Sequence, residues 1–193
     1  FDVTGTALTI DSSGTGNVDI DSLAVADVVV ATLTAGTGTI TFEQSGNVDL
    51  TVTTTTTTDG AISISNVGDA DADVLLVTTA TAGGNTGSND DITLLTTTAG
   101  DITIGVLTAA NDVVTITAAG AINDNGDNDA AADIVATTID LNAVDGIGNT
   151  ASFDVTGTAL TIDSSGTGNV DIDSLAVADV VVATLTAGTG TIT

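Results

Sequence analysis

The amino-acid sequence predicts an all-β fold of the parallel β-helix (β-solenoid) type, with about seven coils of ~22 residues in each 152-residue tandem repeat. Three observations predict it. Residues 1–41 recur letter for letter as residues 153–193, glycines mark a shorter unit inside this long period, and β-branched residues with glycine punctuation dominate the chain. Such residues favour strands and turns. One short unit cannot bury its apolar side alone, whereas stacked units close a continuous core.

The long repeat defines the expected domain organisation. The chain holds one full repeat of 152 residues and the first 41 residues of the next. We therefore expect residues 1–193 to form a single continuous solenoid segment, a window of a longer tandem array. A string of β-sandwich domains is the alternative, because it would also use regular short strands. The marker spacing favours the solenoid, since a sandwich has no reason to place the same dipeptide at every second strand.

The first strand of each unit is expected to follow a glycine. Two residues after most of these glycines comes Val or Ile, and alternation follows, as in NVDID, TITFE and AISIS, which is the pattern of a half-buried strand. Thr86 and Gly148 interrupt this rule. We expect the glycines at the corners of the coils, where a positive φ is easily adopted. They are Gly16, Gly38, Gly60, Gly84, Gly100, Gly120, Gly146 and Gly168.

The second strand of each unit is expected to follow an aspartate that precedes an aliphatic residue. We expect these aliphatic residues, from Val28 to Val155, to point inward as one column. The segments 68–73 and 123–129 are rich in Asp and Asn and are expected to be loops that leave the solenoid. The aspartates are Asp27, Asp49, Asp73, Asp91, Asp112, Asp133, Asp154 and Asp179.

Aligned in one column, these eight aspartates would form a carboxylate ladder. Neighbouring strands lie about 4.8 Å apart, and at that distance two carboxylates repel each other by roughly 0.9 kcal/mol in water. The chain has no Lys, Arg or His to offset this repulsion. Two interpretations stay open. Each aspartate caps a turn by accepting a backbone N–H, or bound divalent cations bridge the ladder.

Two acidic segments are candidate calcium sites. Asp69, Asp71 and Asp73 alternate and would share one face of a strand, while Asp124, Asp127 and Asp129 surround a glycine turn. Calcium prefers six to eight hard oxygen ligands of this kind. Neither segment has the EF-hand spacing, so solvated acidic loops are the alternative interpretation. Ca²⁺ is the one cofactor that the sequence suggests, and none is required.

Composition excludes several classes of function. The formal net charge is −26, and Lys, Arg, His and Cys are all absent. The usual zinc ligands, a Ser-His couple, a Schiff-base lysine and a P-loop lysine are therefore missing. Nucleic acid is not an expected partner, because nothing neutralises phosphate. No transmembrane segment is expected, since the most apolar run, residues 23–33, is short and contains Asp27. We expect a protein that is not an enzyme.

Coils of about 20 residues rich in Gly, Thr and Asp resemble the repeat regions of long bacterial surface and secreted adhesins, the filamentous-haemagglutinin-like β-helix proteins. The texture is strongest in GAINDNGDNDAAADIVATTIDLNAVDGIG, residues 120–148. The resemblance covers the whole chain but is compositional, and the GGxGxDxUx nonapeptide of calcium-binding repeats is absent. It implies a right-handed parallel β-helix, export from the cell and a rod-like role without catalysis.

The expected function is therefore that of a structural component of an extracellular filament, sheath or cell-surface fibre. Its partners would be further copies of the repeat along the fibre, laterally bundled fibres, and divalent cations between like-charged shafts. The alternative is an adhesin shaft that contacts cells, glycans or ice. Pairs of outward threonines, Thr32/Thr34, Thr54/Thr56 and Thr96/Thr98, suggest that alternative.

Overall fold

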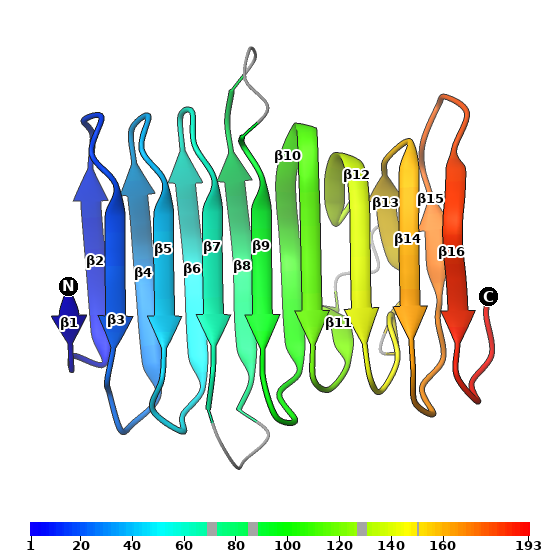
Figure 1. The fold of residues 1–193 in the computed structure, drawn as a ribbon, viewed down its shortest axis with the longest axis horizontal. Coiled ribbons are helices and arrows are strands. Elements are labelled where there is room, and N and C mark those ends of the chain that lie inside the picture. Colours follow the sequence, from blue (N-terminus) through cyan, green and yellow to red (C-terminus); the bar gives the residue numbers. More distant parts are fainter. Residues whose placement is uncertain (69–72, 85–88, 127–130, 150) are drawn as a thin grey trace.

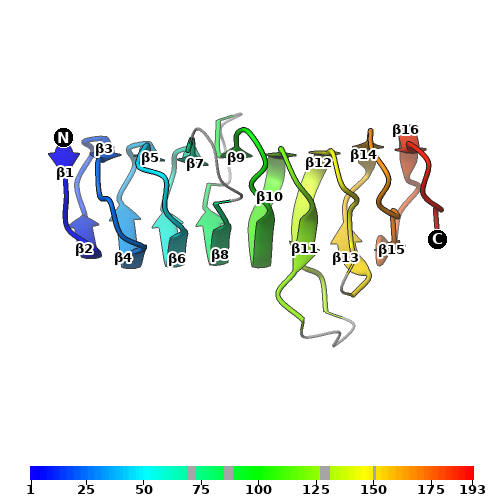
Figure 2. The same ribbon diagram turned by 90° about the horizontal axis from the view of Figure 1, so that it is seen from below.

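The computed structural model describes residues 1–68, 73–84, 89–126, 131–149 and 151–193. Over these residues the regular structure is all β, and parallel strands stack into a β-solenoid of about 8 turns (Figure 1). The fold class predicted from the sequence is confirmed. The coils follow one another along a single axis with the two termini at opposite ends (Figure 2). In the described part of the chain, no helix is long and apolar enough to cross a membrane.

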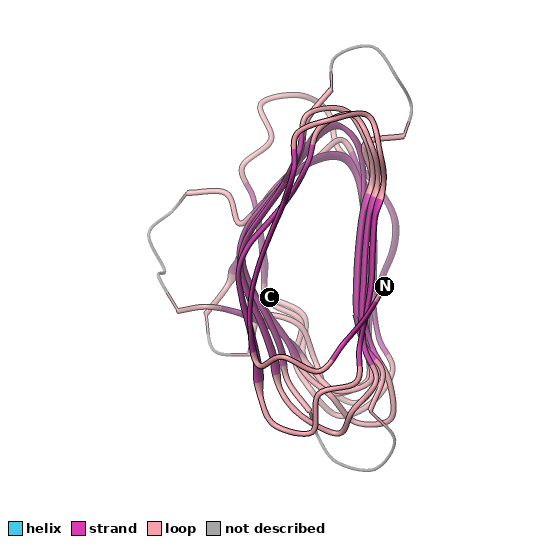
Figure 3. Ribbon diagram, turned by 90° about the vertical axis from the view of Figure 1, so that its left-hand side faces the viewer, coloured by secondary structure: helices cyan, strands magenta, loops and turns pink. Residues whose placement is uncertain are grey.

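Each turn of the solenoid contributes one strand to each of two parallel sheets, which enclose the interior (Figure 3). The front sheet of Figure 1 contains β1 (Asp2–Val3), β3 (Val18–Ser22), β5 (Ile40–Gln44), β7 (Ile62–Asn66), β9 (Ile92–Thr96), the second half of β10 (Ile102–Ala118), the second half of β12 (Ile134–Ala143), β14 (Ala159–Ser164) and β16 (Val181–Ala187). The back sheet contains β2 (Ala7–Ser12), β4 (Val28–Ala35), β6 (Leu50–Thr57), β8 (Leu75–Ala82), the first half of β10, β11 (Ile122–Asp124), the start of β12, β13 (Phe153–Thr156) and β15 (Ile172–Ser174).

The aliphatic residues that follow the marker aspartates are divided between the two sheets, so the single inward column expected from the sequence is wrong. In the back sheet Val28 pairs with Leu50 and Leu50 with Leu75, whereas Ile92 pairs with Ile62 in the front sheet. The Asp-aliphatic dipeptide precedes strands of both sheets, so it does not identify one of them. The inward position expected for Val74 is occupied by Leu75, one residue later, which pairs with Leu50.

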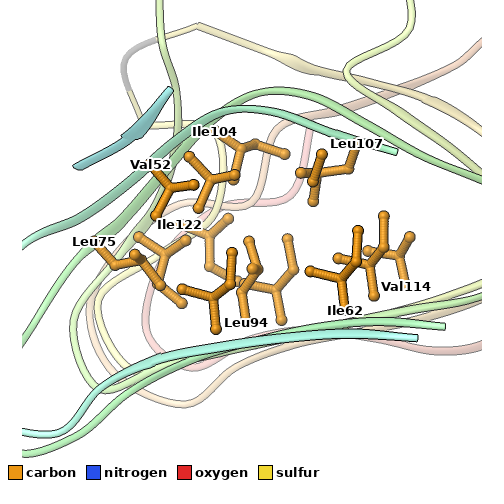
Figure 4. Packing of buried hydrophobic residues seen from close by; sticks show 14 of the residues in the cluster. Val52, Ile62, Leu75, Leu94, Ile104, Leu107, Val114 and Ile122 are labelled. Atoms are coloured by element: carbon orange, nitrogen blue, oxygen red, sulfur yellow. The ribbon is translucent and has the colours of Figure 1, made fainter. Parts of the chain in front are cut away.

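The core is a narrow layer of aliphatic side chains between the two sheets (Figure 4). Strand residues alternate between buried and outward positions, as in β5 and β7. Phe42 and Phe153 are the largest of the fully buried side chains. Because aromatic residues are only 2% of the sequence, Val, Ile, Leu and Ala provide most of the apolar surface removed from water.

The corner glycines are required mainly by the close approach of successive coils. A Cβ at Gly46 would lie 1.9 Å from the carbonyl oxygen of Ala24, and one at Gly38 would lie 2.2 Å from that of Gly16. Of the glycines that the structure describes, only four have a positive φ, and neither Gly38 nor Gly46 is one of them. Positive φ, the reason expected from the sequence, is thus the less common one at these corners.

The two expected loops are only partly described, because 69–72 and 127–130 lie outside the described residues. Gly68 and Asp73 lie between β7 and β8, outside any strand, as expected for 68–73. In the second segment the expected boundary is wrong, because Asn123 and Asp124 belong to β11 and pair with β10. The inward aliphatic Ile122 pairs with Ile102 and draws the residues that follow it into the sheet.

Candidate functional site: aspartates between the coils

Aspartate and asparagine oxygens join successive coils at the corners. The Asp49 carboxylate accepts the backbone N–H of Val74 at 2.8 Å, and the Asp133 carboxylate accepts that of Asp154 at 2.8 Å. In each case the donor lies in the next coil, just before a strand or at its start. The side chain therefore satisfies an N–H that the strand ladder does not reach. In five more pairs a side-chain oxygen of the first residue accepts the backbone N–H of the second: Asp27 and Asp49, Asp91 and Val113, Asp101 and Ala121, Asn17 and Thr39, and Asn169 and Thr191.

These contacts agree with the capping interpretation of the aspartates, with the donor in the neighbouring coil rather than in the same turn. The Asp-aliphatic rule did not find Asn17 and Asn169. It also did not find Asp101, although Ile102 follows it, because Gly100 had already marked that strand as the first of its unit. A search for Asp or Asn directly before any strand, whichever sheet it joins, would have found Asn17 and Asp101, and the repeated sequence would then have added Asn169 as the counterpart of Asn17.

The structure divides the eight aspartates of the expected ladder between the two sheets. Asp27, Asp49 and Asp73 precede successive strands of the back sheet, as does Asp133, and Asp154 lies in β13 of the same sheet. Asp91, Asp112 and Asp179 accompany β9, the second half of β10 and β16 in the front sheet. By register, Asp27 lies beside Asp49 and Asp133 beside Asp154, whereas Asp73 falls one residue before the position opposite Asp49. No more than two of the eight aspartates therefore align in consecutive coils.

The two candidate calcium segments are only partly described. Asp69, Asp71, Asp127 and Asp129 lie outside the described residues. The Asp73 carboxylate packs against Gly68, where a Cβ would lie 2.2 Å from Oδ2, and Asp124 is buried in β11. Among the residues that the structure does describe, no group of three or more acidic side chains is arranged to hold a metal ion.

Asp90 is a buried carboxylate that the sequence analysis missed, and Asp59 and Asp112 lie near enough to act on its charge. Asp90 is 2% exposed, and its Oδ1 accepts the backbone N–H of Gly60 at 2.6 Å. Burial raises the pKa of Asp90 above its ordinary value of 3.8; the Gly60 bond lowers it, and the nearby Asp59 and Asp112 raise it further. Gly84 packs on the other side, where a Cβ would lie 1.7 Å from Asp90 Oδ2. The only sequence signal was the Asp90-Asp91 doublet.

Replacing Asp90 with asparagine is expected to stabilise the protein at neutral pH. The folded state holds the Asp90 proton more tightly than the unfolded state. The stability that this proton provides is complete below about pH 3.8 and is lost as the pH rises through the raised pKa of the folded state. Above that pKa the buried carboxylate is a penalty, which Asp90→Asn removes while keeping an acceptor for Gly60.

The measurement for Asp90 is the thermal midpoint of Asp90→Asn and of the wild type between pH 3 and pH 8. The control is Asp21→Asn, which removes the same charge from an exposed position of β3. We expect the excess gain of Asp90→Asn over Asp21→Asn to be largest at pH 7 and to shrink toward pH 4. Equal gains for the two variants at every pH would contradict this expectation.

Removing one inter-coil cap is expected to have a smaller effect. Asp49→Ala leaves the Val74 N–H without its acceptor and should lower the free energy of unfolding by about 1 kcal/mol. Asp49→Asn keeps an acceptor oxygen and removes one charge, so its stability should match or exceed that of the wild type. Urea denaturation measures both variants, with Asp19→Ala as the control for loss of an exposed carboxylate. A loss for Asp49→Asn as large as that for Asp49→Ala would show that charge, not the acceptor, matters.

Outward threonines form rows on the back sheet. Thr54 pairs with Thr79, and Thr56 pairs with both Thr34 and Thr81. Thr81 also pairs with Thr108, which extends the second row to a fourth coil. The third pair expected from the sequence, Thr96/Thr98, does not join these rows, because Thr96 is buried and lies at the end of β9 in the front sheet.

Comparison of this chain with protein-family models, with curated proteins and with solved structures finds no match. The class of the protein is therefore defined by its own geometry: a β-solenoid of parallel strands whose coils are joined at the corners by Asp and Asn side chains.

Proposed function

We propose that this protein is a structural, non-catalytic component of an extracellular filament, sheath or surface fibre. One observation carries the proposal: both copies of the repeated sequence rebuild the same contacts between coils. Thr34 donates to Asp11, and Thr186 donates to Asp163 in the second copy. The backbone N–H of Thr39 is bound by Asn17 at 3.1 Å and that of Thr191 by Asn169 at 3.0 Å. Repeats that reproduce their own stacking contacts can be added without a change of design, as a rod requires.

The charge of the chain supports a role for cations in such a filament. A net charge of −26 without any basic side chain makes parallel shafts repel one another. Divalent cations between the shafts would screen or bridge this repulsion. Lateral bundling is therefore proposed to depend on calcium or a similar ion, while the stacking of coils inside one shaft depends on the core.

Immunogold electron microscopy of intact, unpermeabilised cells of the source organism, with antibodies raised against this chain, tests the proposal. We expect label along extracellular fibres, which should unbundle on chelation at constant ionic strength and keep a meridional reflection near 4.8 Å. Antibody pre-adsorbed with the purified chain is the control. Label confined to the cell interior would overturn the proposal.

An adhesin shaft that contacts glycans or ice is the second candidate, and the threonine rows of the back sheet favour it. Flat rows of hydroxyl and methyl groups offer a regular surface that a repeating ligand could match. The test compares the wild-type chain with Thr54→Val/Thr56→Val/Thr81→Val for retention on immobilised glycans and for incorporation into growing ice. Equal behaviour of the two chains in both assays would reject this candidate.

A further inference from the structure

The two identical copies of the repeated sequence lie on opposite sheets of the solenoid. β2 and β4 belong to the back sheet, but their counterparts β14 and β16 belong to the front sheet. Conversely, β3 lies in the front sheet and its counterpart β15 in the back sheet. Figure 1 shows the exchange directly, because the arrows of β2 and β4 point up and those of β14 and β16 point down. Strands of identical sequence thus run in opposite directions across the molecule.

The two copies of the repeated sequence form the same strand pairing in both sheets. Ala7 pairs with Val29 and Leu8 with Val30, then the register shifts by one residue so that Thr9 pairs with Thr32. The second copy repeats this register, including the shift, between Leu160 and Thr161. The corner contacts of Asn17 and Asn169 are reproduced as well. The two sheets are therefore equivalent templates for the same strand.

The exchange follows from an odd number of strand passes between equivalent residues. Counted over the described residues, the chain makes 13 passes from Val18 to its counterpart Val170, and successive passes lie in opposite sheets. In its described residues, the unit that begins at Gly84 contributes a single strand, β9, where most units contribute two. The passes are 18–22, 28–35, 40–44, 50–57, 62–66, 75–82, 92–96, 102–109, 113–118, 122–124 together with 134–136, 138–143, 147 together with 153–156, and 159–164.

We infer that consecutive 152-residue repeats are related by a half turn about the solenoid axis. Each repeat adds six and a half turns, or about 31 Å of length, and two repeats of about 62 Å restore the starting orientation. A tandem array then presents the same residues alternately on its two broad faces. The threonine rows of the back sheet recur on the front face of the next repeat, so one filament offers them to neighbours on both sides. The continuation of the half turn along a longer array rests on the proposed function, whereas the half turn between the two copies in this chain does not.

Cysteine cross-linking in the isolated chain tests the half turn. The chain has no cysteine, and outward residues paired on adjacent parallel strands lie within disulfide range. Asp140→Cys/Thr161→Cys should cross-link, because these residues pair in the front sheet. Thr41→Cys/Ser63→Cys is the positive control. Val135→Cys/Thr161→Cys should not cross-link, because Val135 lies in the back sheet. Cross-linking of Val135 with Thr161, or failure of Asp140 with Thr161 while the control pair reacts, would overturn the inference.

Diffraction from an aligned tandem array gives a second, independent test. A half turn per repeat predicts a first meridional reflection near 31 Å and an off-meridional layer line near 62 Å. A whole number of seven turns predicts a meridional reflection near 34 Å with no layer line at twice that spacing. The second pattern would overturn the half turn and leave the filament proposal standing. Cross-linking as expected, together with immunogold label only inside cells, would support the half turn and overturn the filament proposal.

Discussion

Replacing Phe153 with alanine is expected to lower the free energy of unfolding by about 3–5 kcal/mol, as is typical of a large aromatic removed from a packed core. Phe153 is 0% exposed and pairs with Ile172 in the back sheet. The small aliphatic side chains around it cannot expand to fill the space that its ring leaves. This is one of the two largest effects that the structure predicts.

The matched control is the same substitution at Phe1. The sequence that follows Phe1 is identical to the sequence that follows Phe153, yet Phe1 is 82% exposed and Phe153 is packed between stacked coils. Phe1→Ala should therefore change the free energy of unfolding by less than about 0.5 kcal/mol. Urea denaturation monitored by circular dichroism measures both variants. Similar losses for the two variants would contradict the burial that the structure assigns to Phe153.

The second large effect is expected at a corner glycine. A Cβ at Gly168 would lie 1.7 Å from the carbonyl oxygen of Asp145 and 2.2 Å from the carbonyl carbon of the same residue. Because both atoms belong to the backbone of the preceding coil, Gly168→Ala must push two coils apart, and we expect a loss of about 1–3 kcal/mol. The disturbance should be local, since coils contact mainly their neighbours.

Gly16 provides the control for Gly168, because it occupies the equivalent position in the first copy of the repeat. A Cβ there would meet nothing within 4 Å. Gly16→Ala should leave stability unchanged or raise it slightly by restricting the unfolded chain. Amide hydrogen exchange locates the effect, which should appear as faster exchange at Ile147 and Val170 for Gly168→Ala alone. Unchanged exchange at these two amides would contradict the close approach of the coils.

The aspartate contacts illustrate what sequence reasoning could and could not supply. That an Asp before a strand accepts a backbone N–H is a local property of the residue, and Asp27, Asp49 and Asp91 follow it. The coil that supplies the N–H is a matter of stacking and was not predicted. The burial of Asp90 was also missed, because it depends on Gly60 and Gly84, which are distant in the sequence and meet Asp90 only after the coils stack.

The sequence by itself determined that the chain is a β-solenoid. The 41-residue identity at a period of 152 residues, the spacing of the glycines and the alternation of apolar residues are all local or periodic, and period-two alternation fixes which side chains face inward. Only the tertiary structure decided which sheet each strand joins. Both sheets accept the same Asp-aliphatic strand, so the choice depends on how many strands precede it, and the single strand between Gly84 and Gly100 makes that number odd. Phe1 and Phe153 occupy equivalent positions in the repeated sequence but differ in exposure. The reason is related: neighbouring coils bury a side chain, and the residue type alone does not.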